Sequence, residues 1–396
     1  MRPPLIRGSV VKTDSVDLLS RLIAFPTVSC DSNLELIQFV AAHLEAVGVA
    51  VQIMPDETGR KANLYATVGP ADRPGVMLSG HTDVVPVQGQ DWTVPPFQMT
   101  DRDGRLYGRG SADMKGFVAC AVSAMVRAAT RDLRTPLHLA LSYDEEIGCV
   151  GVHEMIDVLA RAPFRPLFGI VGEPTGLSVA TGHKGKTALN VVCTGRAAHS
   201  ALAPTGVNAI HLATDLIQLI RDTQTDLAER GQRDVDYDIP YSTLHVGKIS
   251  GGTVLNIVPN RCELAFEIRT LASDDPMTIL ERVRADAEPL VKAARRIAPE
   301  SDMSIEVTNS YPGLDTPKGA PVVAFARELL RVEDTKKVAY GTEGGLFHQR
   351  LGVPVVVCGP GSMDQGHQPD EFVTRAQIEA CDQMLEILLA KLKMGL

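Results

Sequence analysis

The hydrophobic pattern changes along the chain, and this change constrains the fold more than any other feature. Residues 76–79, 137–142 and 167–171 form short, continuous apolar runs, which are typical of strands buried on both faces of a sheet. Residues 262–269 and 303–308 instead nearly alternate apolar and polar side chains. A period of two predicts antiparallel strands with one face in water. The two patterns therefore predict two different sheets in one chain.

Helical patterns between the strands indicate how the two sheets are connected. In the outer parts of the chain, helices are predicted between the apolar runs, so these parts are expected to form an α/β layer. The middle part has the order strand, helix, strand, strand, helix, strand, which is the ferredoxin-like split unit. We predict one α/β domain made of residues 1–182 and 313–396, interrupted by an inserted α+β domain at residues 183–312. The predicted helices span residues 17–25, 35–47, 116–129, 207–222, 276–294, 321–330 and 374–393.

The composition excludes several classes of protein. The chain has 396 residues, a length typical of two or three domains. Its apolar fraction of 44% is too high for a disordered chain, yet no apolar run approaches the ~20 residues of a membrane span. The first residues show no signal-peptide pattern. With 48 acidic against 39 basic side chains and no basic block, we expect neither nucleic acid nor a membrane as a partner.

The cysteine pattern indicates the compartment. Seven cysteines are scattered along the chain, and none of them forms a CxxC pair. This pattern favours free thiols, which persist in a reducing environment. We therefore expect a cytoplasmic protein.

Charged and imidazole side chains stand just after the apolar runs of the predicted α/β domain. Sites in open α/β sheets form at the carboxyl ends of the strands, so these side chains are expected to converge. Each one alone has an ordinary structural explanation, such as a turn residue, a solvated carboxylate or a helix cap. Their convergence favours a functional cluster. The candidates are His81, Asp83, Asp144, Glu145, Glu146, Glu173 and His367, together with Asp113 just before a predicted helix.

The residue types in this cluster indicate a metal centre. Histidine and carboxylate ligands without cysteine suit Zn²⁺, Co²⁺ or Mn²⁺. If five of the candidates were ligands, they would exceed what one tetrahedral zinc with an open position needs. Two metal ions that share a bridging carboxylate would use all of them, at the ~3.5–4 Å spacing of dinuclear sites. Asp83, two residues after His81, is placed to orient the imidazole.

Longer motifs around these residues resemble those of the M20 family of metallopeptidases and amidohydrolases. The motifs are residues 79–86, which begin Ser-Gly-His-Thr-Asp, residues 108–116, 144–146 and 172–174, and the late His367. The likeness covers nearly the whole chain. It implies a mixed-sheet, zinc-peptidase-like catalytic domain, interrupted by a ferredoxin-like lid and dimerisation domain.

The resemblance implies a role for each predicted ligand. His81, Asp113 and Glu173 would hold one metal ion. Asp113, Glu146 and His367 would hold the other, so Asp113 would bridge the two. The ions would be Zn²⁺ or Co²⁺.

Three further expectations for the centre follow from the same resemblance. Glu145 would act as the general base. Asp83 would orient His81. The peptide bond between Asp113 and Met114 would be cis.

Further stretches, at residues 249–260, 340–347 and 358–371, resemble the amidohydrolase members of the family. They imply hydrolysis of an N-acyl amino acid, foremost N²-acetyl-L-ornithine, to L-ornithine and acetate in arginine biosynthesis. Another M20 amidohydrolase activity is the alternative, such as desuccinylation of succinyl-diaminopimelate or an aminoacylase reaction. The alternative of a different class is a non-catalytic protein that binds a metal or an amino acid.

Five residues outside the metal cluster are expected to act on the substrate. By the resemblance, His199 would reach into the partner's active site in a homodimer and stabilise the oxyanion; otherwise it connects a strand to a helix. Arg269 would pair with the substrate carboxylate, a bidentate interaction that suits guanidinium, and otherwise is a solvated charge. Glu343 is a candidate partner for the substrate ammonium, or an ordinary carboxylate in a Gly-rich turn. Asn256 and Thr342 complete the expected substrate-binding set.

Overall fold

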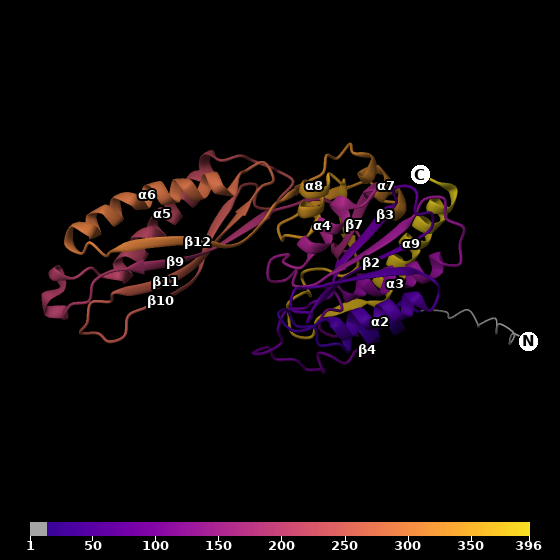
Figure 1. Cartoon of the computed structure of the whole chain (residues 1–396), viewed down its shortest axis with the longest axis horizontal. Helices are drawn as coiled ribbons and strands as arrows, with labels where there is room; N and C mark the ends of the chain where they lie inside the picture. Colours follow the sequence, from indigo (N-terminus) through magenta and orange to yellow (C-terminus); the bar gives the residue numbers. More distant parts are fainter. Residues whose placement is uncertain (1–13) are drawn as a thin grey trace, which may run out of the picture. The chain divides into compact units, whose positions relative to one another are not determined.

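The computed structural model describes residues 14–396, and the chain divides into two compact units. The first unit comprises Met1–Thr181, Thr316–Thr335 and Thr342–Leu396. The second comprises Gly182–Asp315 and Lys336–Gly341 (Figure 1). Residues 1–13, over which no signal-peptide pattern is expected, lie outside the described part.

A mixed sheet forms the centre of the first unit. Its strands run in the order β1-β2-β6-β3-β7-β15-β8. The central strands β6, β3, β7 and β15 are parallel, whereas β1 and β2 pair antiparallel at one edge. The expected mixed α/β fold is therefore confirmed. The strands are β1 (Ala50–Pro55), β2 (Ala62–Val68), β3 (Val76–His81), β6 (Leu137–Ser142), β7 (Phe168–Pro174), β8 (Val179–His183) and β15 (Val355–Gly359). The short strands β13 (Leu314–Asp315) and β14 (Thr335–Val338) belong to the second unit, apart from Thr335.

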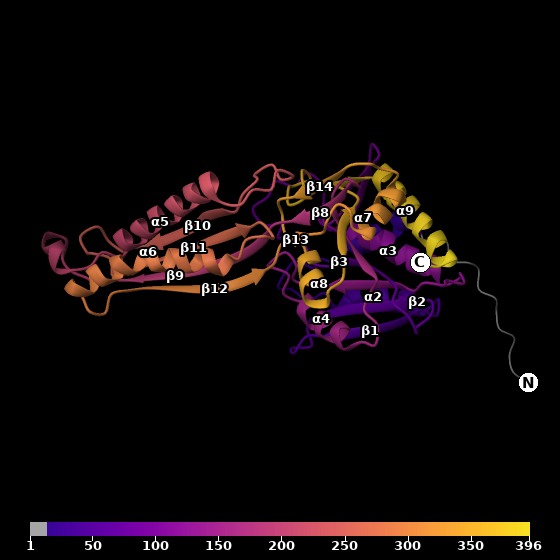
Figure 2. The same ribbon diagram turned by 90° about the horizontal axis from the view of Figure 1, so that it is seen from above.

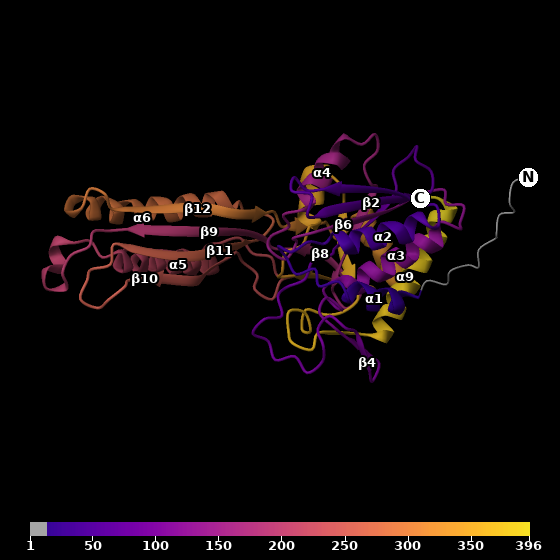
Figure 3. The same cartoon turned by 60° about the horizontal axis from the view of Figure 1, so that its bottom comes forward.

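Helices cover both faces of this sheet, which is why its central strands have no polar face. Figure 3 shows β2 and β6 between α4 on one side and α2 and α3 on the other. Helix α3 is buried along its whole length except at Arg127, and its alanine-rich sequence lets α1 and α9 pack closely against it. The helices are α1 (Ser15–Ile23), α2 (Leu34–Glu45), α3 (Lys115–Ala128), α4 (Val152–Arg161), α7 (Pro321–Leu330), α8 (Gly344–Leu351) and α9 (Arg375–Met394).

A small antiparallel sheet completes the first unit, in the order β16-β5-β4. It joins segments that are far apart in the chain, because β16 near the C-terminus pairs with β5. This pairing brings the segment after His367 close to the segment before Asp113. The strands are β4 (Thr100–Arg102), β5 (Arg105–Tyr107) and β16 (Phe372–Thr374).

The second unit contains a four-stranded antiparallel sheet in the order β10-β11-β9-β12. Helices α5 and α6 lie side by side on one face of it (Figures 1 and 2). The alternation along β11 places Cys262, Leu264, Phe266 and Ile268 in the core beneath the helices. The unit has the βαββαβ order expected from the sequence. Its elements are β9 (Gly185–Thr194), the 3₁₀ helix η1 (Ser200–Thr205), α5 (Ala209–Arg230), β10 (Thr243–Gly251), β11 (Arg261–Thr270), α6 (Pro276–Ile297) and β12 (Asp302–Tyr311).

The sequence patterns did not indicate several short elements, namely β1, β2, α4 and α8. Helix α8 begins at Gly344, within the stretch for which a Gly-rich turn is one interpretation. Two consecutive glycines are poor helix formers, so the local sequence favours a turn there. The helix instead packs against β7 and β15, and this tertiary packing overrides the local preference. Over residues 14–396, no helix is both long and apolar enough to cross a membrane.

Candidate metal centre

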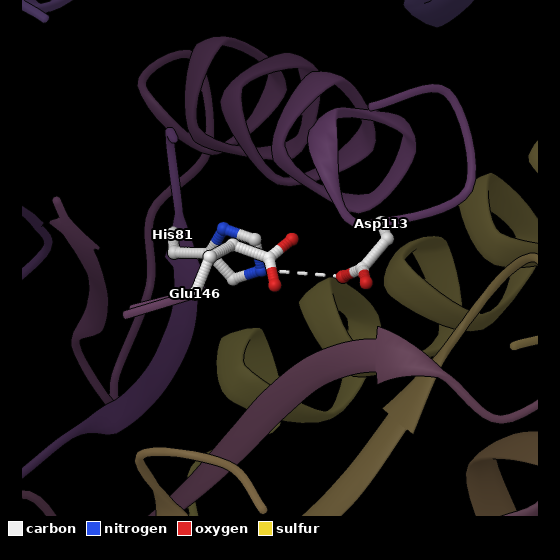
Figure 4. A group of neighbouring side chains, drawn as sticks. All are labelled: His81, Asp113 and Glu146. Carbon is white, nitrogen blue, oxygen red and sulfur yellow. Dashed lines mark hydrogen bonds and ion pairs between the residues drawn. The ribbon is translucent and has the colours of Figure 1, made fainter. Parts of the chain in front are cut away.

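Three of the predicted ligands lie at or just beyond the carboxyl ends of three parallel strands, at one edge of the central sheet. His81 is the last residue of β3, Glu173 lies next to the end of β7, and Glu146 follows the end of β6. Because β3 pairs in parallel with both β6 and β7, the three carboxyl ends lie together. Asp113 enters from the loop that precedes α3, as Figure 4 shows.

Close packing between α3 and β7 positions Glu173. The ring of Phe117 on α3 lies directly against the backbone at Gly172. A Cβ atom on Gly172 would come within 1.9 Å of that ring, so only glycine fits this position. Glu173 follows immediately and is 4% exposed.

His81 stands between two carboxylates. Its Nε2 lies 3.2 Å from Oδ1 of Asp113 and 3.9 Å from Oε2 of Glu173. Potential ligand atoms of His81, Asp113 and Glu146 all lie within 4.8 Å of one another. Those of His81, Glu145 and Glu173 do the same. The imidazole is 1% exposed, so these groups meet below the surface.

His367 approaches the same carboxylates from the loop between β15 and β16. Its Nε2 lies 3.1 Å from Oδ2 of Asp113 and 3.0 Å from Oε2 of Glu146. Asp113 therefore directs one carboxylate oxygen at each histidine, Oδ1 at His81 and Oδ2 at His367. The structure thus brings all five predicted ligands together, with Asp113 in the middle. The peptide bond between Asp113 and Met114 is cis.

Asp83 contacts both the imidazole of His81 and the backbone of the turn that carries Glu145 and Glu146. Its Oδ1 lies 3.5 Å from Nδ1 of His81, and its main-chain oxygen lies 2.9 Å from the same nitrogen. The carboxylate also accepts hydrogen bonds from the backbone N–H groups of Glu145 (3.1 Å) and Glu146 (3.3 Å). The hydroxyl of Ser29 donates a further bond of 2.7 Å to Oδ2. Spacing alone suggested only the contact with His81.

Glu145 lies beside the predicted ligands and has a thiol neighbour. The Cys149 thiol donates a hydrogen bond of 3.3 Å to Oε1 of Glu145. Cys149 is fully buried, and burial raises the pKa of its thiol well above the usual value. The thiol therefore stays protonated and acts as a donor. The sequence placed Cys149 near Glu145, but no pattern indicated this contact.

The electrostatics of the cluster favour a cation. Burial, with the neighbouring carboxylates, raises the pKa of Glu145 to about 8 and that of Glu146 to about 7. The pKa of Glu173 is also well above its usual value, mainly because the group is buried. Hydrogen bonds to Asp113 and Glu146 raise the pKa of His367 to about 10. Buried carboxylates repel one another unless positive charge lies between them, so this donor set fits divalent metal ions.

A buried ion pair supports the loop that carries Asp113, and sequence reasoning missed its role. Arg109 Nη1 lies 2.7 Å from Oε2 of Glu371, and both side chains are 1% exposed. Oε1 of Glu371 accepts hydrogen bonds from the N–H groups of Ala112 (2.9 Å) and Asp113 (3.0 Å). Both charged residues lie within motif stretches, at 108–116 and 358–371, and that placement was the available signal.

The second unit contains three of the predicted substrate-binding or catalytic residues, and none of them belongs to a group of potential metal ligands. His199 is exposed, and its Nδ1 accepts a hydrogen bond of 3.1 Å from the N–H of Ala201, which caps η1. Asn256 is also exposed. Arg269 forms two hydrogen bonds with the carboxylate of Glu267, of 3.0 and 3.3 Å. The cap made by His199 agrees with its ordinary interpretation as a connector between a strand and a helix. Arg269 is ion-paired within its strand and is not the solvated charge of its ordinary interpretation.

Thr342 and Glu343 belong to the first unit and are buried. Thr342 is completely inaccessible, and its hydroxyl accepts a hydrogen bond of 3.0 Å from the N–H of Gly344. Glu343 is 1% exposed at the start of α8. Burial raises the pKa of its carboxyl to about 7, and nearby His81 opposes that shift. Glu343 therefore lies close to the metal cluster and not in a solvent-exposed turn.

Comparison with known sequences identifies relatives along almost the whole chain. The sequence model of peptidase family M20/M25/M40 matches residues 77–391. Acetylornithine deacetylase of Pasteurella multocida (strain Pm70) is 34% identical over 388 residues, which cover 96% of this chain and 98% of that one. Acetylornithine deacetylase of Proteus mirabilis (strain HI4320) is 36% identical over 382 residues, with 94% and 95% covered.

Solved structures share the fold at lower sequence identity. An M20 family metallo-carboxypeptidase from Sulfolobus solfataricus superposes with a TM-score of 0.77 at 19% identity, covering 96% of this chain and 99% of that one. A dinuclear metal binding peptidase of the M20 family from Bacillus subtilis gives a TM-score of 0.67 at 14% identity, with 96% and 98% covered. These likenesses extend over both units of the chain.

Proposed function

Because the chain belongs to peptidase family M20/M25/M40, we propose that it is a metal-dependent amidohydrolase that converts N²-acetyl-L-ornithine to L-ornithine and acetate. The relatives named acetylornithine deacetylase support this substrate, since they match at 34–36% identity over nearly the full length. The observation that carries the chemistry is the position of Asp113 between two histidines, with Glu145 beside them. The reaction would be a step of arginine biosynthesis in the cytoplasm.

The donor set fits two divalent ions, which we propose to be Zn²⁺ or Co²⁺. His81, Asp113 and Glu173 would hold one, and Asp113, Glu146 and His367 the other. When bound, such ions would supply Lewis-acid chemistry, by polarising the acyl carbonyl and acidifying water. The crowded, buried carboxylates support this assignment, because their raised pKa values fall when a cation neutralises them.

Glu145 would transfer the proton in this reaction. Its carboxylate would accept a proton from the attacking water and return it to the departing α-amine. Two contacts hold Glu145 in position, because its backbone N–H donates to Asp83 and its Oε1 accepts from Cys149. Asp83 also keeps Nδ1 of His81 occupied, which leaves Nε2 free to act as a ligand.

The second unit would act as a lid and a dimerisation domain. We propose a homodimer in which His199 stabilises the tetrahedral oxyanion in the partner's active site. Arg269, with Asn256, would bind the substrate carboxylate, after exchanging its present partner Glu267 for the ligand. The exposure of His199 and Asn256 supports these roles, because a group that acts on another surface has to be accessible.

Two buried residues of the first unit would complete the substrate site. Glu343 would balance the side-chain ammonium of N²-acetylornithine. Thr342 would fix the backbone that presents Glu343, through its hydrogen bond to Gly344. The proximity of Glu343 to the metal cluster supports its role, because the electrostatic influence of His81 reaches its carboxyl group.

A substrate panel combined with metal exchange tests the proposal. The protein is dialysed against a chelator, and amide hydrolysis is then measured after return of Zn²⁺ or Co²⁺. The panel contains acetylornithine, acetylcitrulline, acetylmethionine and succinyl-diaminopimelate. We expect activity to return with metal and kcat/KM to be highest for acetylornithine. A preference for the succinyl substrate or acetylmethionine would replace the substrate assignment, and no metal-restored hydrolysis would indicate a binding protein.

A further inference from the structure

A second buried ion pair lies directly beside the proposed base. The side chain of Lys61 pairs with Oδ2 of Asp144, the residue that precedes Glu145. The two side chains are only 11% and 10% exposed. Nothing in the sequence motifs indicates this contact, because Lys61 stands 83 positions before Asp144 and outside every motif.

Asp144 sits at the bend of the chain between β6 and the two glutamates. Its φ of 53° lies in the left-handed region, which few residues other than glycine, asparagine and aspartate adopt readily. Its Oδ1 accepts a hydrogen bond of 3.0 Å from the N–H of Cys30. Asp144 therefore ties this bend to two other segments, one through each carboxylate oxygen. Any shift of the bend would displace Glu145 and Glu146 together.

Lys61 is itself held in place from several sides. Its backbone N–H donates a hydrogen bond of 3.0 Å to Oδ1 of Asp56. The next residue begins β2, an inner strand of the central sheet. The ammonium group of Lys61 also lies 5.7 Å from the centre of the Tyr143 ring, within cation–π range. The ammonium of Lys61 is thus placed by a residue that directly precedes an inner strand and whose backbone is hydrogen-bonded.

The charge arrangement gives the pair a specific role. Asp144, Glu145 and Glu146 are three consecutive carboxylates, and each of them is at least partly buried. The ammonium of Lys61 neutralises the first of them. The remaining two are then available for proton transfer and for metal binding. Without Lys61, the carboxylate of Asp144 would lose its counter-charge beside these two groups.

We propose that Lys61 is a positioning residue, which acts through Asp144 to hold the Glu145-Glu146 turn in the geometry that binds metal. The role rests on the proposed function, since it supports the same dinuclear site. Groups that orient metal ligands typically contribute 10–100-fold to metal affinity or activity.

Three variants test this role: Lys61→Met, Asp144→Asn and the double variant. Asparagine keeps the shape of Asp144 and tolerates the left-handed backbone. We expect Lys61→Met to weaken Zn²⁺ binding by at least ~10-fold in competition with a chelator. We also expect an altered absorption spectrum of the Co²⁺-loaded protein, and a fall in kcat that exceeds any change in KM.

The double variant separates positioning from simple loss of stability. Removal of both partners leaves no unpaired buried charge, so the midpoint of thermal unfolding should recover towards the wild-type value. If Lys61 positions the turn, metal affinity and kcat stay low in the double variant although stability recovers. Wild-type metal affinity and kcat in the double variant would overturn the proposal.

Lys337→Met provides a matched control in the second unit. Lys337 is also a mostly buried lysine, 7% exposed, and pairs with Asp234 and Asp315. We expect its loss to lower thermal stability without a change in Zn²⁺ affinity. An equal loss of Zn²⁺ affinity in both lysine variants would indicate a general effect of stability and would contradict the specific role of Lys61.

The metal measurements are independent of the substrate. If no panel substrate is hydrolysed while Lys61→Met still loses metal selectively, the proposed activity fails and the positioning role stands. If acetylornithine is hydrolysed and Lys61→Met binds metal normally, the activity stands and the positioning role is wrong.

Discussion

The two units of the molecule present their candidate functional residues in opposite ways. In the first unit, five candidate ligands from separate segments meet at one edge of a sheet, mostly buried and in contact with one another. In the second unit, His199 and Asn256 are exposed, and Arg269 is engaged by its strand neighbour Glu267. No comparable cluster of metal-binding groups forms among the described residues of that unit.

Under the proposed roles, this difference separates chemistry that is complete within one unit from chemistry that depends on assembly. The topology of the first unit alone brings the candidate ligands and the proposed base together. The proposed groups of the second unit would act on a ligand or surface brought to them. We therefore expect mutations in the first unit to remove chemistry within one chain, and mutations at His199 to be rescued by another chain.

The largest effect is expected from Glu145→Gln. The change removes the proton acceptor but keeps the shape of the side chain, so kcat should fall by roughly 10²–10⁴-fold. Metal content, measured on the purified protein, should stay at the wild-type level, because Glu145 is not one of the five proposed ligands. Normal turnover in this variant would disprove its role as base.

Glu146→Gln is the matched control for this experiment. The residue is adjacent and similarly placed, but it lies 3.0 Å from His367 among the proposed ligands. It should therefore lose metal as well as activity. If both variants lose metal equally, the division of roles between the two glutamates is wrong.

The sequence predicted that the candidate ligands come together, but not the contacts that support them. His81, Glu146 and Glu173 could be predicted because they follow apolar strands, and parallel strands end at the same edge. Lys61 and Ser29 could not, because they reach Asp144 and Asp83 from segments more than 50 positions away. Such contacts depend on how the chain packs, which no local period encodes.

The two units also differ in how far their helices and strands can be predicted from local sequence. In the inserted unit, side chains alternate regularly along β11, and Asn208 and Asp275 cap helices α5 and α6. These are local signals from which strands and helices can be predicted. In the first unit, helix α8 was missed, because its Gly-Gly start resembles a turn and only packing against β7 and β15 stabilises it. The burial of Glu343 is a consequence of that helix, so it could not be predicted either.

The second prediction concerns His199→Ala. Loss of one oxyanion-stabilising group typically lowers kcat by about 10²–10³-fold. Zn²⁺ affinity should not change, because His199 is not one of the five proposed ligands. His245→Ala is the control, since it removes another exposed histidine from the same unit and should leave kcat unchanged.

Mixing two inactive variants tests whether His199 acts on a partner. If it does, a mixed dimer of Glu145→Gln and His199→Ala chains contains one site with both an intact base and an intact His199. Activity should then appear after the two proteins are unfolded and refolded together. A mixture that remains inactive although mixed dimers form would show that His199 acts within its own chain or not at all.

The smallest effect is expected from Glu343→Gln, and it concerns specificity. A carboxylate that pairs with the substrate ammonium loses a charge-assisted hydrogen bond in this variant, which is worth about 1.5–3 kcal/mol. KM for acetylornithine should rise by about tenfold or more, whereas KM for acetylmethionine, which has no ammonium, should hardly change. The buried position of Glu343 makes the comparison of the two substrates necessary, because a purely structural carboxylate 1% exposed near His81 would also affect activity when replaced. Equal effects on both substrates would assign Glu343 to the support of the metal centre, and the ammonium would then need another partner.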